Sequence, residues 1–379
     1  MIYKMHFMKF KTISFFLFIS FLLVQCIKEP DTNGTNLIDD FDRKEMLENL
    51  SDNFIIPGYQ NYLNEINDLE NSVNVFEQSP NLTTLTQVGD QFYLAASAWQ
   101  KISFLEFGPA ENIQLRSQTN VYPVDTALIN SNIDSANYSL ASIINIPAKG
   151  WQSIDYLLFH NGNSNNSLNY FNSNTARIQY LKDVIVDLKS NAEYVLTNWQ
   201  NSYRLTFIDN NATNASGSAV SDMTNAIISH YEAFIRKGKI GLPVGVFNGF
   251  SQAPMPFHVE GLYLGSKLEY ASTAMQYFKK FINGLHFNGN EDGLGLLDYA
   301  NFVGAVAESE NLSTAVNSQI DRIILANGLC TDTWSEFVQL SPAVSEEIYI
   351  TYQRLIPLLK IDLTSALGII ITFQDNDGD

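Results

Sequence analysis

The stretch IQYLKDVIVDLKSNAEYVLTNWQNSY, residues 178–203, decides the fold class of this chain. Its apolar residues recur every three or four positions, which is the spacing of one face of an α-helix. The members of this stripe are Ile178, Leu181, Ile185, Leu188, Ala192, Val195, Trp199 and Tyr203. They predict a helix of about 30 residues, roughly 45 Å long.

The same helical periodicity recurs along most of the chain. Further apolar stripes occupy residues 88–102, 220–234, 262–281 and 316–323. Strict alternation of apolar and polar residues, which would indicate half-buried strands, is hard to find. We therefore expect an all-α protein.

The length of 379 residues predicts two helical domains, because single cores stop growing at roughly 250–300 residues. The polar residues 209–218 are the expected boundary, which gives domains at 37–208 and 219–379. Residues 238–259 contain Pro243, Pro254 and Pro256 and are expected to form a long irregular segment. Such connections are often functional.

The N-terminus resembles a bacterial lipoprotein signal. Lys4, Lys9 and Lys11 precede an apolar run at residues 12–24, which is too short to span a bilayer. Cys26 follows the run as in a lipobox, although Gln25 stands where a small residue is usual. We predict a signal peptide at 1–25, lipidation of Cys26 and a tether at 26–36. The alternative is an ordinary signal peptide with an incidental cysteine.

The net charge of the chain is −18. Removal of residues 1–25, which hold three lysines and no acidic residue, would change it to −21. Such a surface repels nucleic acid, which we exclude as a partner. Acidity of this size either attracts cations or only keeps the protein soluble.

Gln152 and Asp155 form the most informative pair of polar residues. They lie three positions apart in the stretch AKGWQSIDYLLF, residues 148–159, so a helix would place both on one face. One interpretation is a polar pocket in which Asp155 accepts a hydrogen bond from an arginine or a ligand. The other is an ordinary helix start after Gly150, where Asp155 favours the positive end of the helix dipole.

Four stretches together resemble the imelysin-like proteins, also described as imelysin peptidases or insulin-cleaving metalloproteinases of bacterial envelopes. The family motif Gly-x-His-x-x-Glu aligns with Gly150, Gln152 and Asp155. The other similar stretches are residues 99–116, 234–243 and 363–379. The resemblance implies two helical bundles packed side by side, with a site near their interface, and a periplasmic or outer-membrane lipoprotein often linked to iron uptake.

The resemblance places the metal-binding histidine of the family at Gln152 and its glutamate at Asp155. An amide oxygen binds zinc or iron poorly, whereas an imidazole suits both. A catalytic zinc also needs three protein ligands and an open position. The sequence contains no His-x-x-Glu or His-Glu-x-x-His motif. We therefore predict no resident metal and no catalytic residue, with a divalent ion such as Zn²⁺ or iron as the alternative.

Four further charged residues are candidates for the ligand site. Arg116 and Arg236 follow aligned motifs and are suited to carboxylates and phosphates. Either is expected to pair with Asp155 or Glu106, to hold an anionic ligand, or to form a structural salt bridge. Lys239 lies between two glycines, which allow close approach of a ligand, or it caps a helix.

These residues lead to three hypotheses of function. The first is a lipid-anchored binding protein of the bacterial cell envelope, whose interdomain pocket contains Gln152, Asp155, Arg116, Arg236, Lys239 and Glu106 and takes a small ligand or peptide. The second is a metallopeptidase that uses Asp155 with ligands from other helices. The third is an interaction subunit of an iron or haem uptake system in the envelope. We rank them in this order.

Overall fold

Helices dominate residues 40–289 and 291–374, which the computed structural model describes, so the expected all-α class is confirmed. Up to residue 209 the helical segments are α2 (Arg43–Asn49), η1 (Leu50–Ile55), α3 (Ile56–Gln78), α4 (Leu82–Gln100), α5 (Pro109–Asn112), α6 (Leu115–Thr119), α7 (Thr126–Ser135), η2 (Ile143–Ala148), α8 (Trp151–Phe159), α9 (Ser164–Ser173), α10 (Ala176–Asn198), η3 (Trp199–Tyr203) and α11 (Arg204–Asp209).

The second half of the chain is also helical. Its helical segments are α12 (Ala219–His230), η4 (Tyr231–Gly241), α13 (Leu242–Val244), η5 (Gly249–Ser251), α14 (Glu269–Ile282), α15 (Leu296–Phe302), α16 (Leu312–Asn327), α17 (Trp334–Leu340), α18 (Pro342–Gln353), α19 (Leu355–Pro357), η6 (Leu358–Leu363) and α20 (Thr364–Ala366). Between α15 and α16, the two-residue strands β1 (Val306–Ala307) and β2 (Glu310–Asn311) pair antiparallel. The segments η2 and η5 are 3₁₀-helices, whereas η1, η3, η4 and η6 are π-helices.

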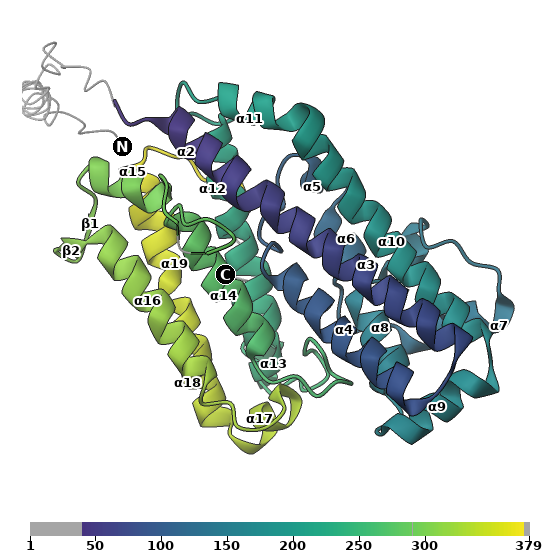
Figure 1. The fold of residues 1–379 in the computed structure, drawn as a ribbon. Helices are drawn as coiled ribbons and strands as arrows, with labels where there is room; N and C mark the ends of the chain where they lie inside the picture. Colours follow the sequence, from purple (N-terminus) through teal and green to yellow (C-terminus); the bar gives the residue numbers. More distant parts are fainter. Residues whose placement is uncertain (1–39, 290, 375–379) are drawn as a thin grey trace, which may run out of the picture. The chain divides into compact units, whose positions relative to one another are not determined.

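The predicted long helix is present as α10, which continues without a break through η3 into α11. Its stripe from Ile178 to Trp199 is buried, because α10 packs on α3. The helix α3 also packs on α4, whose start is fixed by reciprocal hydrogen bonds between Asn81 and Thr84. Figure 1 shows α3, α4 and α10 side by side, from purple to teal.

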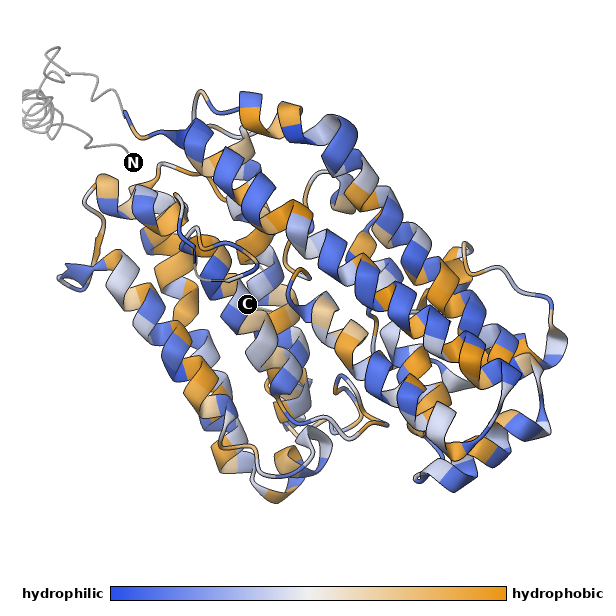
Figure 2. Ribbon diagram, in the orientation of Figure 1, coloured by the Kyte–Doolittle hydropathy of each residue, from blue (hydrophilic) through white to orange (hydrophobic). Residues whose placement is uncertain are grey.

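A second group of helices comes from the later part of the chain. There α14 packs on α16, and α16 packs on α18. The helices α14 and α4 join the two groups by direct contact. Figure 2 shows hydrophobic residues gathered on the sides where the helices meet, and hydrophilic residues along the outward sides. This is the pattern expected of amphipathic helices around a shared core.

The expectation of one helix over residues 262–281 is wrong in its first part. The helix α14 begins only at Glu269, and residues 261–265 form turns. Gly261 and Gly265 have φ values of +67° and +76°, which a continuous α-helix does not allow. The expected irregular segment 238–259 also starts later, because residues 238–241 still belong to η4.

The expected domain boundary at 209–218 falls mostly in the loop between α11 and α12. By their contacts, Phe41–Asp379 group as one unit, and the division into 37–208 and 219–379 stays a prediction. None of the described helices combines the length and the apolar character that crossing a membrane requires. The predicted signal peptide, tether and Cys26 lie outside the described residues.

Candidate functional site

The start of α8 is fixed by a glycine that no other residue can replace without strain. Gly150 has φ +76° and ψ −165°, a backbone conformation that is essentially restricted to glycine. A Cβ atom at this position would lie 2.2 Å from the carbonyl oxygen of Thr119. The close approach therefore depends on Gly150, and it places Gln152 beside Asn120.

Gln152 uses both ends of its buried amide group. Its Nε2 donates to Oδ1 of Asn120 at 2.8 Å, and its Oε1 accepts from the backbone N–H of Gly261 at 2.9 Å. Only 4% of the residue is exposed. The amide thus joins α8 to the segment after α6 and to the segment before α14.

Asp155 lies one turn further along α8 and holds the same segment. Its Oδ2 accepts from the backbone N–H of Tyr263 at 2.9 Å, and its Oδ1 accepts from that of Leu264 at 2.8 Å. Burial raises the pKa of Asp155 to about 7, against the opposing effect of these two hydrogen bonds. The nearby carboxylate of Glu260 contributes to the same upward shift in pKa.

Glu260 is the centre of a buried polar network that the sequence did not predict. Its Oε1 accepts from Nε2 of Gln100 at 2.7 Å and from Nδ2 of Asn120 at 2.5 Å, and its Oε2 forms an ion pair with Lys239. Lys239 also donates to Oε1 of Gln100 at 2.8 Å. All four residues are buried. The network connects α4, η4 and the segment before α14, and it meets Gln152 through Asn120.

Arg116 pairs with Glu106, one of the two partners expected for it. Its Nε lies 3.7 Å from Oε2 of Glu106, and its backbone N–H donates to Oε1 at 3.2 Å. Its guanidinium lies 3.5 Å from the ring centroid of Phe234. Burial lowers the pKa of Arg116 and raises that of Glu106.

Arg236 is not brought to Gln152 and Asp155. Its Nη1 donates to Oε1 of Gln353 at 2.5 Å and to the hydroxyl of Tyr349 at 3.3 Å, both on α18. Its Nη2 lies 3.9 Å from Glu232 within η4. Because η4 is a π-helix, Arg236 and Lys239 do not have the side-by-side spacing that α-helical residues three apart have.

Two small cavities flank the hydrogen bond between Asn120 and Gln152. The first, of about 190 Å³, is lined by Gln152 and Asp155, and the second, of about 210 Å³, is lined by Arg116, Asn120 and Lys239. Tyr122 lines both cavities. The structure therefore places four of the predicted residues, namely Gln152, Asp155, Arg116 and Lys239, in the walls of two adjoining cavities. Glu106 contacts Arg116, and Arg236 lines neither cavity.

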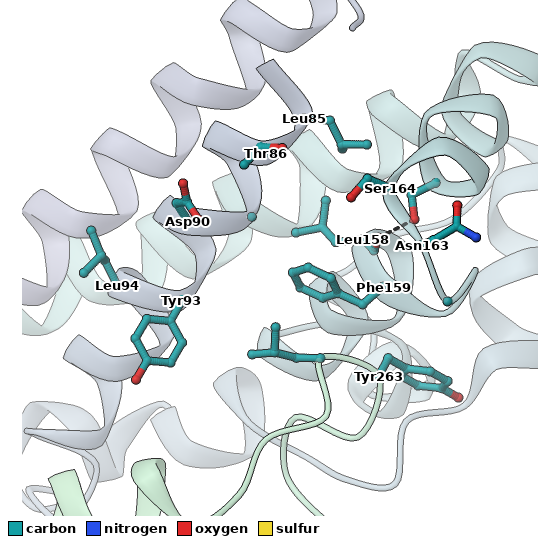
Figure 3. Close-up of a pocket in the computed structure, with 14 residues that line it drawn as sticks. Leu85, Thr86, Asp90, Tyr93, Leu94, Leu158, Phe159, Asn163, Ser164 and Tyr263 are labelled. Atoms are coloured by element: carbon teal, nitrogen blue, oxygen red, sulfur yellow. Dashed lines mark hydrogen bonds between the residues drawn. The ribbon is translucent and has the colours of Figure 1, made fainter. Parts of the chain in front are cut away.

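A larger cavity of about 660 Å³ lies on the other side of residues 263–264, between α4 and the α8–α9 region (Figure 3). Figure 3 shows Asp90 and Tyr93 on one helix, with Leu158 and Phe159 coming from another. Among the described residues that line it, Asp90 is the only charged one. No motif in the sequence pointed to this cavity.

The residues present do not fit the metal that the family resemblance implies. The oxygen atoms of Gln152 and Asp155 already accept backbone hydrogen bonds. Within residues 40–289 and 291–374, no three His, Cys, Asp or Glu side chains gather so that they could hold one ion. A catalytic zinc site normally has three such ligands and an open position.

Sequence reasoning missed Gln100, Asn120 and Glu260. Gln100 lies inside the aligned stretch 99–116, and Glu260 directly follows the proline-containing segment 238–259. These two positions are the sequence features that mark Gln100 and Glu260 as candidates. The sequence offered no comparable signal for Asn120.

Comparison with solved structures gives matches over most of the chain. A predicted iron-regulated protein A precursor from Parabacteroides distasonis has a TM-score of 0.70 and 16% identity, and the match covers 86% of this chain and 95% of that one. An imelysin-like protein from Psychrobacter arcticum has a TM-score of 0.67 and 18% identity, with 87% and 97% covered. At these identities the likeness shows the fold alone.

Comparison with curated protein sequences gives no match. The family model described as Imelysin, peptidase M75, matches residues 55–340 of this chain. This span is well over half of the sequence and includes Gln152, Asp155, Lys239 and Glu260. The resemblance found in the motif around Gly150 is thus confirmed, and the chain belongs to the imelysin family.

Proposed function

We propose that this chain is a non-catalytic binding protein of the bacterial cell envelope, anchored to a membrane through a lipid on Cys26. Its binding site is formed by the two adjoining cavities that share Tyr122, one lined by Gln152 and the other by Asn120. The ligand is a small molecule or a short peptide. The proposal is supported by two facts: the chain belongs to the imelysin family, and it has Gln152 and Asp155 where the family motif has histidine and glutamate.

The observation that carries the proposal is the hydrogen bonding of Gln152. Both ends of the amide are occupied, by Asn120 and by Gly261, at the position where the family motif has histidine. The neighbouring carboxylate of Asp155 is occupied by two backbone N–H groups. The side chains of Gln152 and Asp155 thus hold the segment before α14 in place by hydrogen bonds. In this proposal the ligand is bound in the adjoining cavities.

A link to iron uptake is part of the proposal. It is supported by the structural neighbour from Parabacteroides distasonis, which is named as an iron-regulated protein. If the link holds, the amount of this protein in its cells rises when iron is removed by a chelator. Quantitative immunoblots of cells grown with and without chelator test this, and an unchanged level would count against it.

The peptidase function is the second candidate, because the matched family is described as a peptidase family. Full-length protein purified in detergent without chelators separates the two candidates. Metal content is measured by mass spectrometry, and cleavage is measured on a mixture of peptides. The proposal predicts less than one Zn²⁺ or iron per chain and no cleavage above that of the Asp155→Asn variant.

Two variants sharpen this experiment. Gln152→His restores the family motif, and Gln339→His adds a histidine on the exposed surface of α17 as a control. Stoichiometric metal in the unmodified protein, lost in Asp155→Asn together with peptide cleavage, would overturn the proposal. Metal bound by Gln152→His but not by the unmodified protein would support the proposal, because the natural glutamine then accounts for the absence of metal.

A further inference from the structure

The 660 Å³ cavity shown in Figure 3 is distinct from the two cavities of the proposed function. Of the described residues that line it, only Tyr263 also lines one of those two. One side of α4 forms a wall, since residues 86, 89, 90, 93 and 94 recur at helical spacing. The lining is completed by α8, α9, the loop between them and residues 263–264. The volume lies within the range of roughly 300–1,000 Å³ that is usual for small-molecule sites.

The wall opposite α4 is held in place by bonds within the protein. Asp155 fixes residues 263–264 through the two backbone hydrogen bonds described above. The hydroxyl of Ser167, on α9, donates to the carbonyl oxygen of Leu158, on α8, at 2.8 Å. The protein therefore forms this cavity without the help of a ligand, as is usual for small-molecule sites.

The lining is mostly apolar and aromatic, and part of it is open to solvent. Figure 3 shows the ring of Phe159 extending from α8 towards α4, where Tyr93 and Leu94 are 39% and 49% exposed. Large apolar side chains left uncovered in a concave surface indicate a site for an apolar group. The apolar and aromatic residues of the lining are Leu85, Tyr93, Leu94, Leu158, Phe159, Tyr263 and Leu264.

Asp90 gives this cavity a negative charge. The residue is exposed, and its carboxylate forms no hydrogen bond or ion pair with another residue of the ranges 40–289 and 291–374. None of the described lysines, arginines and histidines lines the cavity. The local charge thus has the same sign as the net charge of −18. Such a wall attracts a cation and repels an anion.

Two cations on the flanking segments are bound elsewhere. Arg177, just after α9, donates to the hydroxyl of Ser173 at 2.7 Å. Lys267, before α14, donates to the backbone carbonyl oxygen of Thr331. Neither residue lines the cavity, so the charge of Asp90 is not balanced within its wall.

We infer that this cavity binds a small organic cation, namely a primary amine carried on an apolar group. Its ammonium group donates to the carboxylate of Asp90, and its apolar part lies against Phe159 and Leu94. Hydrogen bonds between charged groups are stronger than those between neutral groups. Asp90 and Tyr93 are three positions apart on α4, so they are neighbours on one face of the helix. The aromatic ring of Tyr93 adds attraction for a cation bound there.

Benzylamine is the probe, and benzyl alcohol is its uncharged analogue. Each is titrated by calorimetry into full-length protein in detergent at neutral pH, and the heat of titration into detergent alone is subtracted. We expect benzylamine to bind about fivefold more tightly than benzyl alcohol, because an ion pair with an exposed carboxylate contributes modestly to affinity. Equal binding of the two, or no binding of benzylamine, would overturn the inference.

A charge variant assigns this preference to Asp90. Asp90→Asn keeps the size of the side chain and removes its charge, so benzylamine should then bind within about twofold of benzyl alcohol. Asp68→Asn is the matched control, because Asp68 is exposed on the neighbouring helix α3 and does not line the cavity. It should keep the preference of the unmodified protein. An equal loss in the two variants would mean that the acidic surface as a whole attracts the amine, and would contradict the inference.

A steric variant places the ligand in the cavity. Thr86 is exposed on the wall formed by α4, and Thr86→Trp puts an indole ring into the space. Both ligands should lose affinity, because the indole takes the place of their phenyl ring. Thr83→Trp, at an exposed position of α4 outside the lining, is the control and should leave both affinities unchanged. Unchanged affinities in Thr86→Trp would place the ligand elsewhere and overturn the inference.

The inference goes beyond the proposed function and does not depend on it. Binding of an amine beside Asp90 is measured by calorimetry, whereas the proposed function fails if stoichiometric metal and peptide cleavage depend on Asp155. Either result can be obtained without the other, so the two failures are distinguishable.

Discussion

The carbonyl oxygen of Thr119 occupies the place where a side chain at residue 150 would begin, 2.2 Å from the Cβ position. This contact brings the start of α8 against residues 119–120 and so aligns Gln152 with Asn120. Gly150→Ala adds a clash to a backbone conformation that only glycine adopts readily. We expect the free energy of unfolding to fall by about 2–4 kcal/mol, measured by urea denaturation of the full-length protein.

Gly217→Ala is the control for this prediction. Gly217 also has a positive φ, of +86°, but nothing lies within 4 Å of its Cβ position. Its replacement should lower the free energy of unfolding by only about 1 kcal/mol. Equal losses in the two variants would mean that the contact with Thr119 has no effect of its own.

The stability of the protein should depend on the protonation of Asp155. Its pKa is raised to about 7 in the folded protein, so the folded state binds this proton more tightly than the unfolded state. The resulting stabilisation is complete below the unfolded pKa and is lost as the pH rises towards 7. Between pH 5 and pH 8, the unmodified protein should lose about 2–3 kcal/mol relative to Asp155→Asn.

Urea denaturation at several pH values measures this difference. Asp209→Asn, at an exposed position at the end of α11, should keep the profile of the unmodified protein. A parallel profile for Asp155→Asn and the unmodified protein would show that Asp155 does not titrate in this range.

Replacement of only one partner of the Lys239–Glu260 ion pair should strongly lower the free energy of unfolding. Both side chains are 6% exposed, so removal of one leaves the other charged, buried and without its opposite charge. We expect Lys239→Met or Glu260→Gln to lower the free energy of unfolding by about 3–5 kcal/mol. The double variant should lose less than the sum of the two, and additive losses would contradict coupling through this pair.

Membrane attachment should depend on Cys26. Cys26→Ser removes the thiol that we predict to carry lipid, and the protein should move from the membrane fraction to the soluble fraction. Fractionation of cells followed by immunoblotting measures this. Cys330→Ser changes the only other cysteine and should leave the protein in the membrane fraction. Membrane association that survives Cys26→Ser would contradict the prediction.

The sequence predicted the helices well because their signal is local. The stripe from Ile178 to Trp199 needs only the helical period to be recognised, and α10 with η3 confirms it. Gln152 and Asp155 were found for the same reason, because residues separated by three positions lie on the same face of a helix. The late start of α14 was missed because Gly261 and Gly265 act through their backbone conformation rather than through hydrophobicity.

The polar network around Glu260 could not be predicted in this way. Its contacts with Gln100 and Asn120 join residues that are 160 and 140 positions apart in the sequence. The helical periodicity of the sequence carries no information about contacts between such distant residues. Arg236 was chosen because it lies in a stretch that aligns with the family, and Lys239 because it lies between two glycines. The π-helical backbone of η4 changes the angular spacing between them, and nothing in the composition of the segment indicates this change.

Tyr263 contributes to the surface of both the 190 Å³ cavity beside Asp155 and the 660 Å³ cavity beside Asp90. Tyr263 is thus shared by the two cavities, and the hydrogen bonds that the backbone N–H groups of Tyr263 and Leu264 donate to Asp155 fix the position of this part of the chain. If a ligand in one cavity shifts Tyr263, the shape of the other cavity changes as well, and with it the affinity for a ligand there. Thermodynamic linkage then requires the influence to be equal in both directions.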